Sequence, residues 1–169
     1  MSFSPVGYPD DPSSRYALIL EQVDALTDSA DLPNSILATT AALLWQGLPN
    51  INWCGFNLIH RDMLLLGPFC GLPACVRIPL GQGVCGTAAS ADAIQRVLNV
   101  HEFPGHIACD SASNSEIVIP LHWRGRVVGV LDIDSPLIAR FDEIDEANLL
   151  QLTRLIETRC DFSNTAYHL

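Results

Sequence analysis

Three cysteines lie among residues that hold the backbone in tight shapes, which is not how a thiol that only fills a core is placed. They are Cys75 in LPACVR, Cys85 in GQGVCGT and Cys109 in HIACDS. Cys109 is followed by Asp110 and a run of small polar residues, after which Glu116 opens an apolar run. A loop thiol near an acid, with two further loop thiols in the chain, indicates redox or metal chemistry rather than a fixed disulfide framework.

Two other interpretations of these cysteines stay open. Free cysteines are commonly buried, so a structural role is one of them. A zinc site is the other, because the chain holds several residues of zinc-ligand type, namely His101, His106, Cys85 and Cys109. No C-x-x-C pair exists and no spacing among these residues matches the usual zinc motifs, so redox chemistry is favoured and no metal is expected.

The remaining cysteines are expected to have no chemical role. Cys54 lies beside Trp53 in a strand pattern, which is typical of a small core residue. Cys70 falls in PFCGLP, a predicted turn, where a surface or half-buried thiol is expected. Cys160 ends the last predicted helix and has no chemical neighbours in the sequence.

Two carboxylates in GVLDIDSP form a second candidate group. Asp132 and Asp134 are two residues apart on a predicted strand, so they point to the same face as Val130 and Val128. Carboxylates that cluster on such a face repel one another, and at least one should bind a proton more readily and be available as a general acid near neutral pH. For any single one of them, a solvent-facing acid at a strand end is the alternative.

A predicted hairpin at residues 116–134 folds Glu116 back toward these acids. A loop centred on Gly125 would place Glu116 directly across from Asp134. A loop centred between Arg124 and Gly125 would place it on the opposite face of the sheet. Both registers are compatible with the sequence.

The apolar patterns predict an α+β fold with one central antiparallel β-sheet and helices packed on it. Helical spacing covers 15–26 and 35–46, with Ser35 as the expected cap, and an amphipathic helix closes the pattern at 141–160. Strand patterns occupy 51–59, 63–69 and 75–80, and a glycine-rich loop then runs into a helix within 81–97. The turn of the 116–134 hairpin is expected near Trp123 to Arg126.

Length and charge set limits on function. The 169 residues, 49% of them hydrophobic, suit one domain; residues 1–13 are expected to form a loose arm before a domain at 14–169. The formal charge of −10, from 9 basic and 19 acidic residues, argues against nucleic acid or an anionic membrane as a partner. No signal peptide or membrane-spanning stretch is visible, so a cytoplasmic protein is expected.

Three long motifs resemble one known family. GPFCGLPACVRIPLGQGVCGTAA, IQRVLNVHEFPGHIACDSASNSEIVIPL and GVLDIDSP closely resemble the free methionine-(R)-sulfoxide reductases, which are built on a single GAF domain. The resemblance runs from about Ile51 to the end of the closing helix, and its motifs are long and specific. It implies a single GAF domain that reduces free L-methionine (R)-sulfoxide to L-methionine without a cofactor.

The resemblance also implies roles for the cysteines. Cys109 matches the catalytic cysteine, Cys75 the principal resolving cysteine and Cys85 an auxiliary cysteine. In that chemistry a thiolate attacks the sulfoxide sulfur while an acid protonates the leaving oxygen. Cys109 is left as a sulfenic acid, which a second thiol converts to a disulfide, and thioredoxin reopens the disulfide by exchange. A Cys75–Cys109 disulfide is therefore expected.

The family's substrate-contacting residues match four positions of this chain. We expect Glu116 to donate the proton, and Asp132 and Asp134 to hold the ammonium group that only the free amino acid carries. Trp53 is expected to cover the methyl thioether end. Backbone N–H groups after Gly83, at a helix start, are candidates for binding the substrate carboxylate.

Two positions depart from the family pattern. Asn57 stands where such enzymes usually have Tyr, and Cys70 stands where a polar residue such as Gln is usual, which puts an extra thiol close in sequence to Cys75. The resemblance further suggests a homodimer. The alternative function is a non-catalytic GAF module that senses a small ligand, although a sensor needs no set of three loop cysteines.

Overall fold

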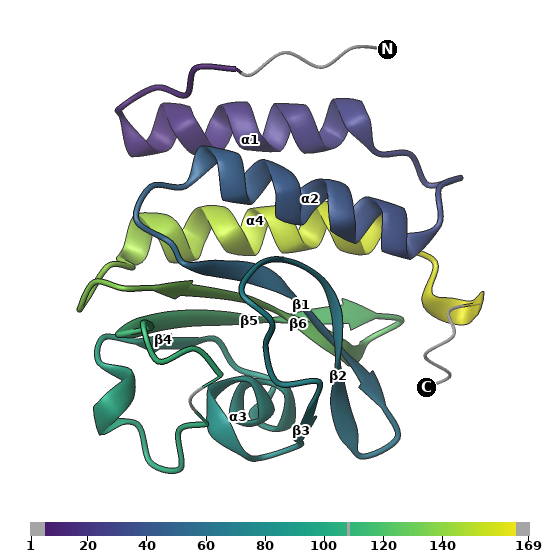
Figure 1. Cartoon of the computed structure of the whole chain (residues 1–169). Coiled ribbons are helices and arrows are strands. Elements are labelled where there is room, and N and C mark those ends of the chain that lie inside the picture. Colours follow the sequence, from purple (N-terminus) through teal and green to yellow (C-terminus); the bar gives the residue numbers. More distant parts are fainter. Residues whose placement is uncertain (1–5, 108, 165–169) are drawn as a thin grey trace.

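One antiparallel sheet is the centre of the fold. The computed structural model describes residues 6–107 and 109–164, and within them six strands lie in the order β3-β2-β1-β6-β5-β4 (Figure 1). The predicted α+β class with a central antiparallel sheet is confirmed. The helices are α1 (Pro12–Leu26), α2 (Pro33–Gly47), α3 (Gly83–Ala91) and α4 (Glu143–Arg159), with short 3-10 turns at Val100–Glu102 and Phe162–Asn164. The strands are β1 (Trp53–His60), β2 (Met63–Gly71), β3 (Arg77–Pro79), β4 (Gln95–Val97), β5 (Ser115–Trp123) and β6 (Arg126–Ser135).

The helices cover the two faces of the sheet unequally (Figure 1). On one face, α2 packs against β1 and β2 while α4 packs against β5, and α1 lies over α2 and α4 as an outer layer. On the other face, α3 is the one α-helix among the described residues, and it packs against β5 and β6. None of the helices in the described residues is long and apolar enough to cross a membrane.

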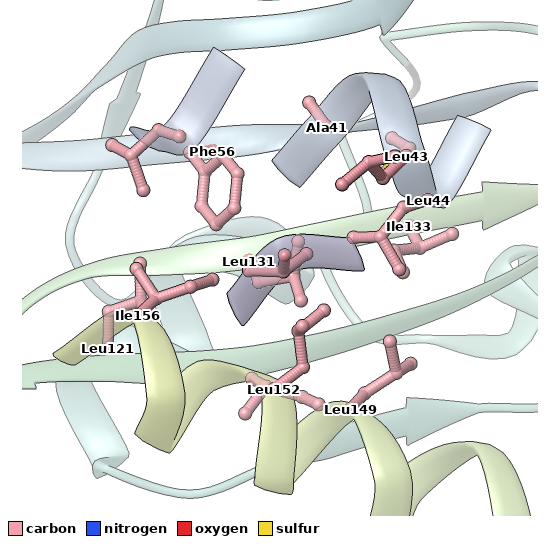
Figure 2. Packing of buried hydrophobic residues seen from close by; sticks show 14 of the residues in the cluster. Ala41, Leu43, Leu44, Phe56, Leu121, Leu131, Ile133, Leu149, Leu152 and Ile156 are labelled. Atoms are coloured by element: carbon pink, nitrogen blue, oxygen red, sulfur yellow. The ribbon is translucent and has the colours of Figure 1, made fainter. Parts of the chain in front are cut away.

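Each face of the sheet has its own core. The larger core lies between the sheet and α2 and α4, where Leu44, Leu131 and Ile156 are fully buried (Figure 2). The smaller core lies under α3 and includes Val118 and Val130. Strand residues alternate between the two cores because successive side chains point to opposite faces. The face under α3 therefore has the smaller of the two cores.

Two helices begin earlier than the sequence predicted. α1 begins at Pro12 because Asp11 caps it, with its Oδ2 accepting from the Ser14 N–H at 2.8 Å, and proline suits the first turn of a helix. α2 begins at Pro33, so the cap predicted at Ser35 is wrong, and Leu32 at the N-cap provides no side-chain bond.

The predicted helix within 81–97 is too long. α3 ends at Ala91, and Asp92 takes a left-handed conformation with φ of 50° that terminates it. Residues Gln95–Val97 form the edge strand β4, which pairs with β5. Cys70 also differs from the prediction, because it lies in β2 opposite Cys54 rather than in a turn, although it is half-buried as expected.

Candidate active site

The β5–β6 hairpin sets which face the acids occupy. At the turn, the register is that of a loop centred between Arg124 and Gly125, which on its own would turn Glu116 away from the other acids. Val128 is an extra residue on β6, and this β-bulge moves the register by one position. Glu116 therefore lies directly across from Asp134.

The three acids consequently share the face that α3 covers. Asp132 and Asp134 alternate with core residues on β6, and both line a cavity together with Glu116. Val130 lies on the same side as predicted, in the core under α3. The prediction for Val128 is wrong, because the bulge turns its side chain into the larger core on the opposite face.

The loop that carries Cys109 is held by hydrogen bonds at its polar residues. Asn52 donates from Nδ2 to Asp110 Oδ2 at 2.9 Å and to Ser113 Oγ at 3.0 Å. Asp110 also accepts the Ala112 N–H through Oδ1, an Asx-type turn that suits this short polar run. Asn52 was not singled out from the sequence, and its place just before β1 gave no signal of this contact.

Cys75 and Cys109 are joined in a disulfide, with their Cα atoms 5.4 Å apart. Cys75 lies between β2 and β3, and Cys109 lies 34 residues later in the loop before β5. This is the pairing that the family resemblance led us to expect. Cys54, Cys70, Cys85 and Cys160 are free.

Cys85 lies in the first turn of α3, facing the acids. Its Sγ donates to Glu116 Oε1 at 3.7 Å, and Asn57 Nδ2 lies 4.0 Å from the same sulfur. α3 comes this close to the sheet because Gly86 has no side chain: a Cβ there would lie 2.4 Å from the Pro79 carbonyl oxygen. Cys85 is thus a buried thiol beside a carboxyl group, outside the disulfide.

Burial raises the pKa of every acid in this cluster. Burial, followed by the charges of Asp132 and Asp134, raises the pKa of Glu116 well above its usual range. Burial and the Asp132 charge do the same to the pKa of Asp134, and burial raises the pKa of Asp132 to about 6. The pKa of Cys85 is also well above its ordinary value, again mainly through burial. Near neutral pH, the cluster therefore retains protons that it could deliver.

Trp53 forms the opposite wall of the site. Its ring stacks on Phe69 with centroids 5.5 Å apart, and its Nε1 donates to the Leu72 carbonyl oxygen at 3.1 Å. Both contacts are with β2 or the residue that follows it, so Trp53 is fixed beside the segment that leads to Cys75.

Two small cavities flank the Cys75–Cys109 disulfide. One, of about 30 Å³, lies toward the start of α3 and is lined by Gly83, Cys85 and Glu116. The other, of about 20 Å³, lies toward Trp53, Asn57 and Cys75. Cys109, Asp132 and Asp134 line both. The structure therefore brings together all seven candidate site residues, namely Cys75, Cys85, Cys109, Trp53, Glu116, Asp132 and Asp134.

Three of the four residues considered for zinc, Cys85, Cys109 and His106, line the larger of the two cavities, and Cys109 is already bonded to Cys75 there. His101 is exposed and bonds to Asn114 at 2.9 Å, whereas His106 lines the larger cavity. Among the described residues, one group of side chains could hold a metal ion, and it consists of Cys85, Glu116 and Asp132. Cys85 is the one member of this group that was also among the four possible zinc ligands named from the sequence.

Comparisons with known proteins agree with this architecture. The GAF domain family model matches residues 20–159. Protein YtsP of Bacillus subtilis is 50% identical over 149 residues, which cover 87% of this chain and 91% of that protein. The free methionine-R-sulfoxide reductase of Escherichia coli is 56% identical over 121 residues, covering 72% of this chain and 73% of the relative.

A solved structure extends the similarity to three dimensions. The free methionine-R-sulfoxide reductase from Neisseria meningitidis, in complex with its substrate, superposes with a TM-score of 0.86 at 40% identity, covering 94% of this chain and 95% of that one. Fold and site together define a GAF domain with a thiol site under its single-helix face. Within that class, the chain belongs to the family of free methionine-(R)-sulfoxide reductases.

Proposed function

We propose that this protein reduces free L-methionine (R)-sulfoxide to L-methionine with its own thiols. The observation that carries the proposal is the Cys75–Cys109 disulfide, which lies between two cavities lined by buried acids. Cys109 and Cys75 match the positions of the catalytic and the resolving cysteine in the family. A GAF module that only sensed a ligand would have no use for this combination.

In the proposed reaction, the Cys109 thiolate attacks the sulfoxide sulfur, and Glu116 protonates the oxygen. Methionine leaves and Cys109 retains the oxygen as a sulfenic acid. The Cys75 thiol then attacks that sulfur, releasing water and forming the disulfide. A dithiol of thioredoxin returns the pair to thiols by two exchange steps, and is itself oxidised to a disulfide.

The acids select the substrate through its ammonium group. Among the described residues that line the two cavities, none is Lys or Arg, and burial lowers the pKa of the one lining histidine, His106, so Asp132 and Asp134 have no cationic neighbour there near neutral pH. A bound ammonium group supplies the missing positive charge, which stabilises the ionised carboxylates. The N–H groups at the start of α3, beside Gly83, are placed to bind the substrate carboxylate. Trp53 covers the methyl end from the other cavity.

Opening the disulfide makes room for the substrate. A cavity of about 30 Å³ holds about two water molecules, whereas methionine sulfoxide has roughly ten non-hydrogen atoms. Cys109 lines both cavities, so separating it from Cys75 joins them into one site that reaches from α3 to Trp53. The oxidised enzyme is then closed to substrate until its disulfide is reduced.

We further propose that the protein works in the cytoplasm as a homodimer. Of the arm predicted at residues 1–13, Pro12 and Ser13 belong to α1, and Tyr8 packs against the larger core. The compartment is supported by the need for a thiol reductant at every turnover and by the four free cysteines, which a reducing environment preserves. The dimer is supported by the family alone. Sedimentation equilibrium of the whole chain measures its mass, and a monomer at micromolar concentration would refute the dimer.

The test of function is NADPH oxidation with thioredoxin, thioredoxin reductase and single sulfoxide epimers. We expect turnover with free L-methionine (R)-sulfoxide and little with the (S) epimer. N-acetylation removes the ammonium charge and leaves the sulfoxide intact, so the N-acetylated substrate should be reduced much more slowly. Equal turnover of the two (R) substrates would remove the ammonium-binding role of Asp132 and Asp134, and no turnover with either would remove the proposed function.

A further inference from the structure

One group of buried side chains has the composition of a metal site. One ligand atom each from Cys85, Glu116 and Asp132 lies within 4.8 Å of the others, and all three residues are buried. The cavity that they line, of about 30 Å³, exceeds the roughly 10–15 Å³ that a single water requires. It therefore has room for an ion and a water molecule.

Asp132 shows that this group is incomplete as it stands. Its side chain is only 8% exposed, and its Oδ1 has no hydrogen-bond partner among the described residues. A buried oxygen without a partner is costly, and a cation is one kind of ligand that satisfies it. No described residue that lines this cavity is Lys or Arg, and burial lowers the pKa of His106, which does line it, so the protein itself supplies no such cation near neutral pH.

The spacing suits a small thiophilic ion. The Cys85 sulfur and Glu116 Oε1 are 3.7 Å apart. Around tetrahedral zinc, a sulfur at about 2.3 Å and an oxygen at about 2.0 Å lie about 3.5 Å from each other. Little movement of these two atoms would therefore complete the coordination, with Asp132 as third ligand and water as fourth.

We propose that Cys85, Glu116 and Asp132 form a binding site for a thiophilic divalent cation of the zinc class. Binding displaces the proton of the Cys85 thiol, together with any carried by the two carboxyl groups, and leaves one thiolate and two carboxylates around the ion. A thiolate ligand favours Zn²⁺ and Co²⁺ over Mg²⁺ and Ca²⁺, which prefer oxygen alone. The ion occupies the place of the substrate's ammonium group and proton donor, so the metal-bound protein is inactive.

The site can be tested on the whole chain without turnover, so its failure is distinct from failure of the proposed function. In the oxidised protein, Cys75 and Cys109 are locked in their disulfide, and the free thiols are Cys54, Cys70, Cys85 and Cys160. Titration with Co²⁺ should produce a near-ultraviolet sulfur-to-cobalt charge-transfer band at one equivalent. Zn²⁺ should abolish the band, because it binds such ligands more tightly than Co²⁺, while excess Mg²⁺ should leave it unchanged.

Variants locate the ligands. Cys85→Ser should lose the band, and Asp132→Asn should weaken Zn²⁺ binding by more than about 100-fold, since loss of a group that only orients a ligand already costs 10–100-fold. Cys160→Ser, which removes a buried thiol at the end of α4, is the matched control and should bind as the wild type does. Circular dichroism verifies that each variant is folded. A wild-type protein without the band, or a folded Cys85→Ser variant that retains it, would overturn the proposal.

Discussion

The buried acids should make the protein less stable as the pH rises, and Asp132→Asn should reveal this. Burial raises the pKa of Asp132 from its usual 3.8 to about 6. In the folded protein the carboxyl group therefore stays protonated at pH values where the unfolded chain has already released the proton. Stability from this group is complete below pH 4 and is lost as the pH rises through about 6. Because one pH unit corresponds to about 1.4 kcal/mol, a pKa raised from 3.8 to about 6 lowers the free energy of unfolding by about 3 kcal/mol once Asp132 is ionised in the folded protein.

Replacement by Asn removes the ionisable group while keeping its shape. At pH 4 the carboxyl group of the unfolded chain is already more than half ionised, so the free energy of unfolding of the variant minus that of the wild type should increase by at least about 2.4 kcal/mol between pH 4 and pH 7.5. The increase is a lower bound, because the Asp132 charge also raises the pKa of Glu116 and of Asp134. For a chain of this length, the melting temperature of the variant minus that of the wild type should be about 5–10 °C larger at pH 7.5 than at pH 4.

Urea unfolding of the oxidised protein at several pH values measures this difference. Asp62→Asn, which makes the same substitution in an exposed turn, is the control for the chemical change alone. If the Asp132→Asn difference stays constant from pH 4 to 7.5, or falls, then Asp132 is ionised in the folded protein and the argument from burial is wrong. The expected increase would also show a conflict between stability and function, since the acids that destabilise the fold are those proposed to bind substrate.

Two further predictions concern the reaction steps. Glu116→Gln keeps the shape of the proposed acid but cannot deliver its proton, so methionine release in a single turnover should slow by about 100-fold or more, while disulfide formation changes far less; an unaltered rate and pH profile would show that another group is the acid. Cys109→Ser should abolish even a single turnover without thioredoxin, whereas Cys75→Ser should complete one turnover and lose most thioredoxin-driven cycling, as measured by methionine released per enzyme. Persistent cycling in Cys75→Ser would assign the resolving role elsewhere.

Local patterns were sufficient for most of the fold. Apolar strand patterns predicted β1, β2, β3, β5 and β6. Helical spacing predicted α1, α2 and α4 within a few residues of their ends. The clearest exception is Gln95–Val97, whose strand structure depends on pairing with β5, a contact that no short window contains. The candidate cysteines and acids came from their motifs, but the contact of Asn52 with the Cys109 loop is tertiary and left no trace in the sequence.

The position of Glu116 shows most clearly why sequence reasoning stopped where it did. The two-residue turn at Arg124 and Gly125 predicts one register, and that register would turn Glu116 away from Asp134. A single extra residue, Val128, reverses the outcome by placing its own side chain in the larger core. In sequence Val128 is one valine in an apolar run, and nothing distinguishes a paired residue from a bulged one. The choice is made by packing, because the bulge allows both the tight turn and the burial of alternate residues. The same bulge that satisfies the core therefore assembles the acid cluster on which the proposed chemistry depends.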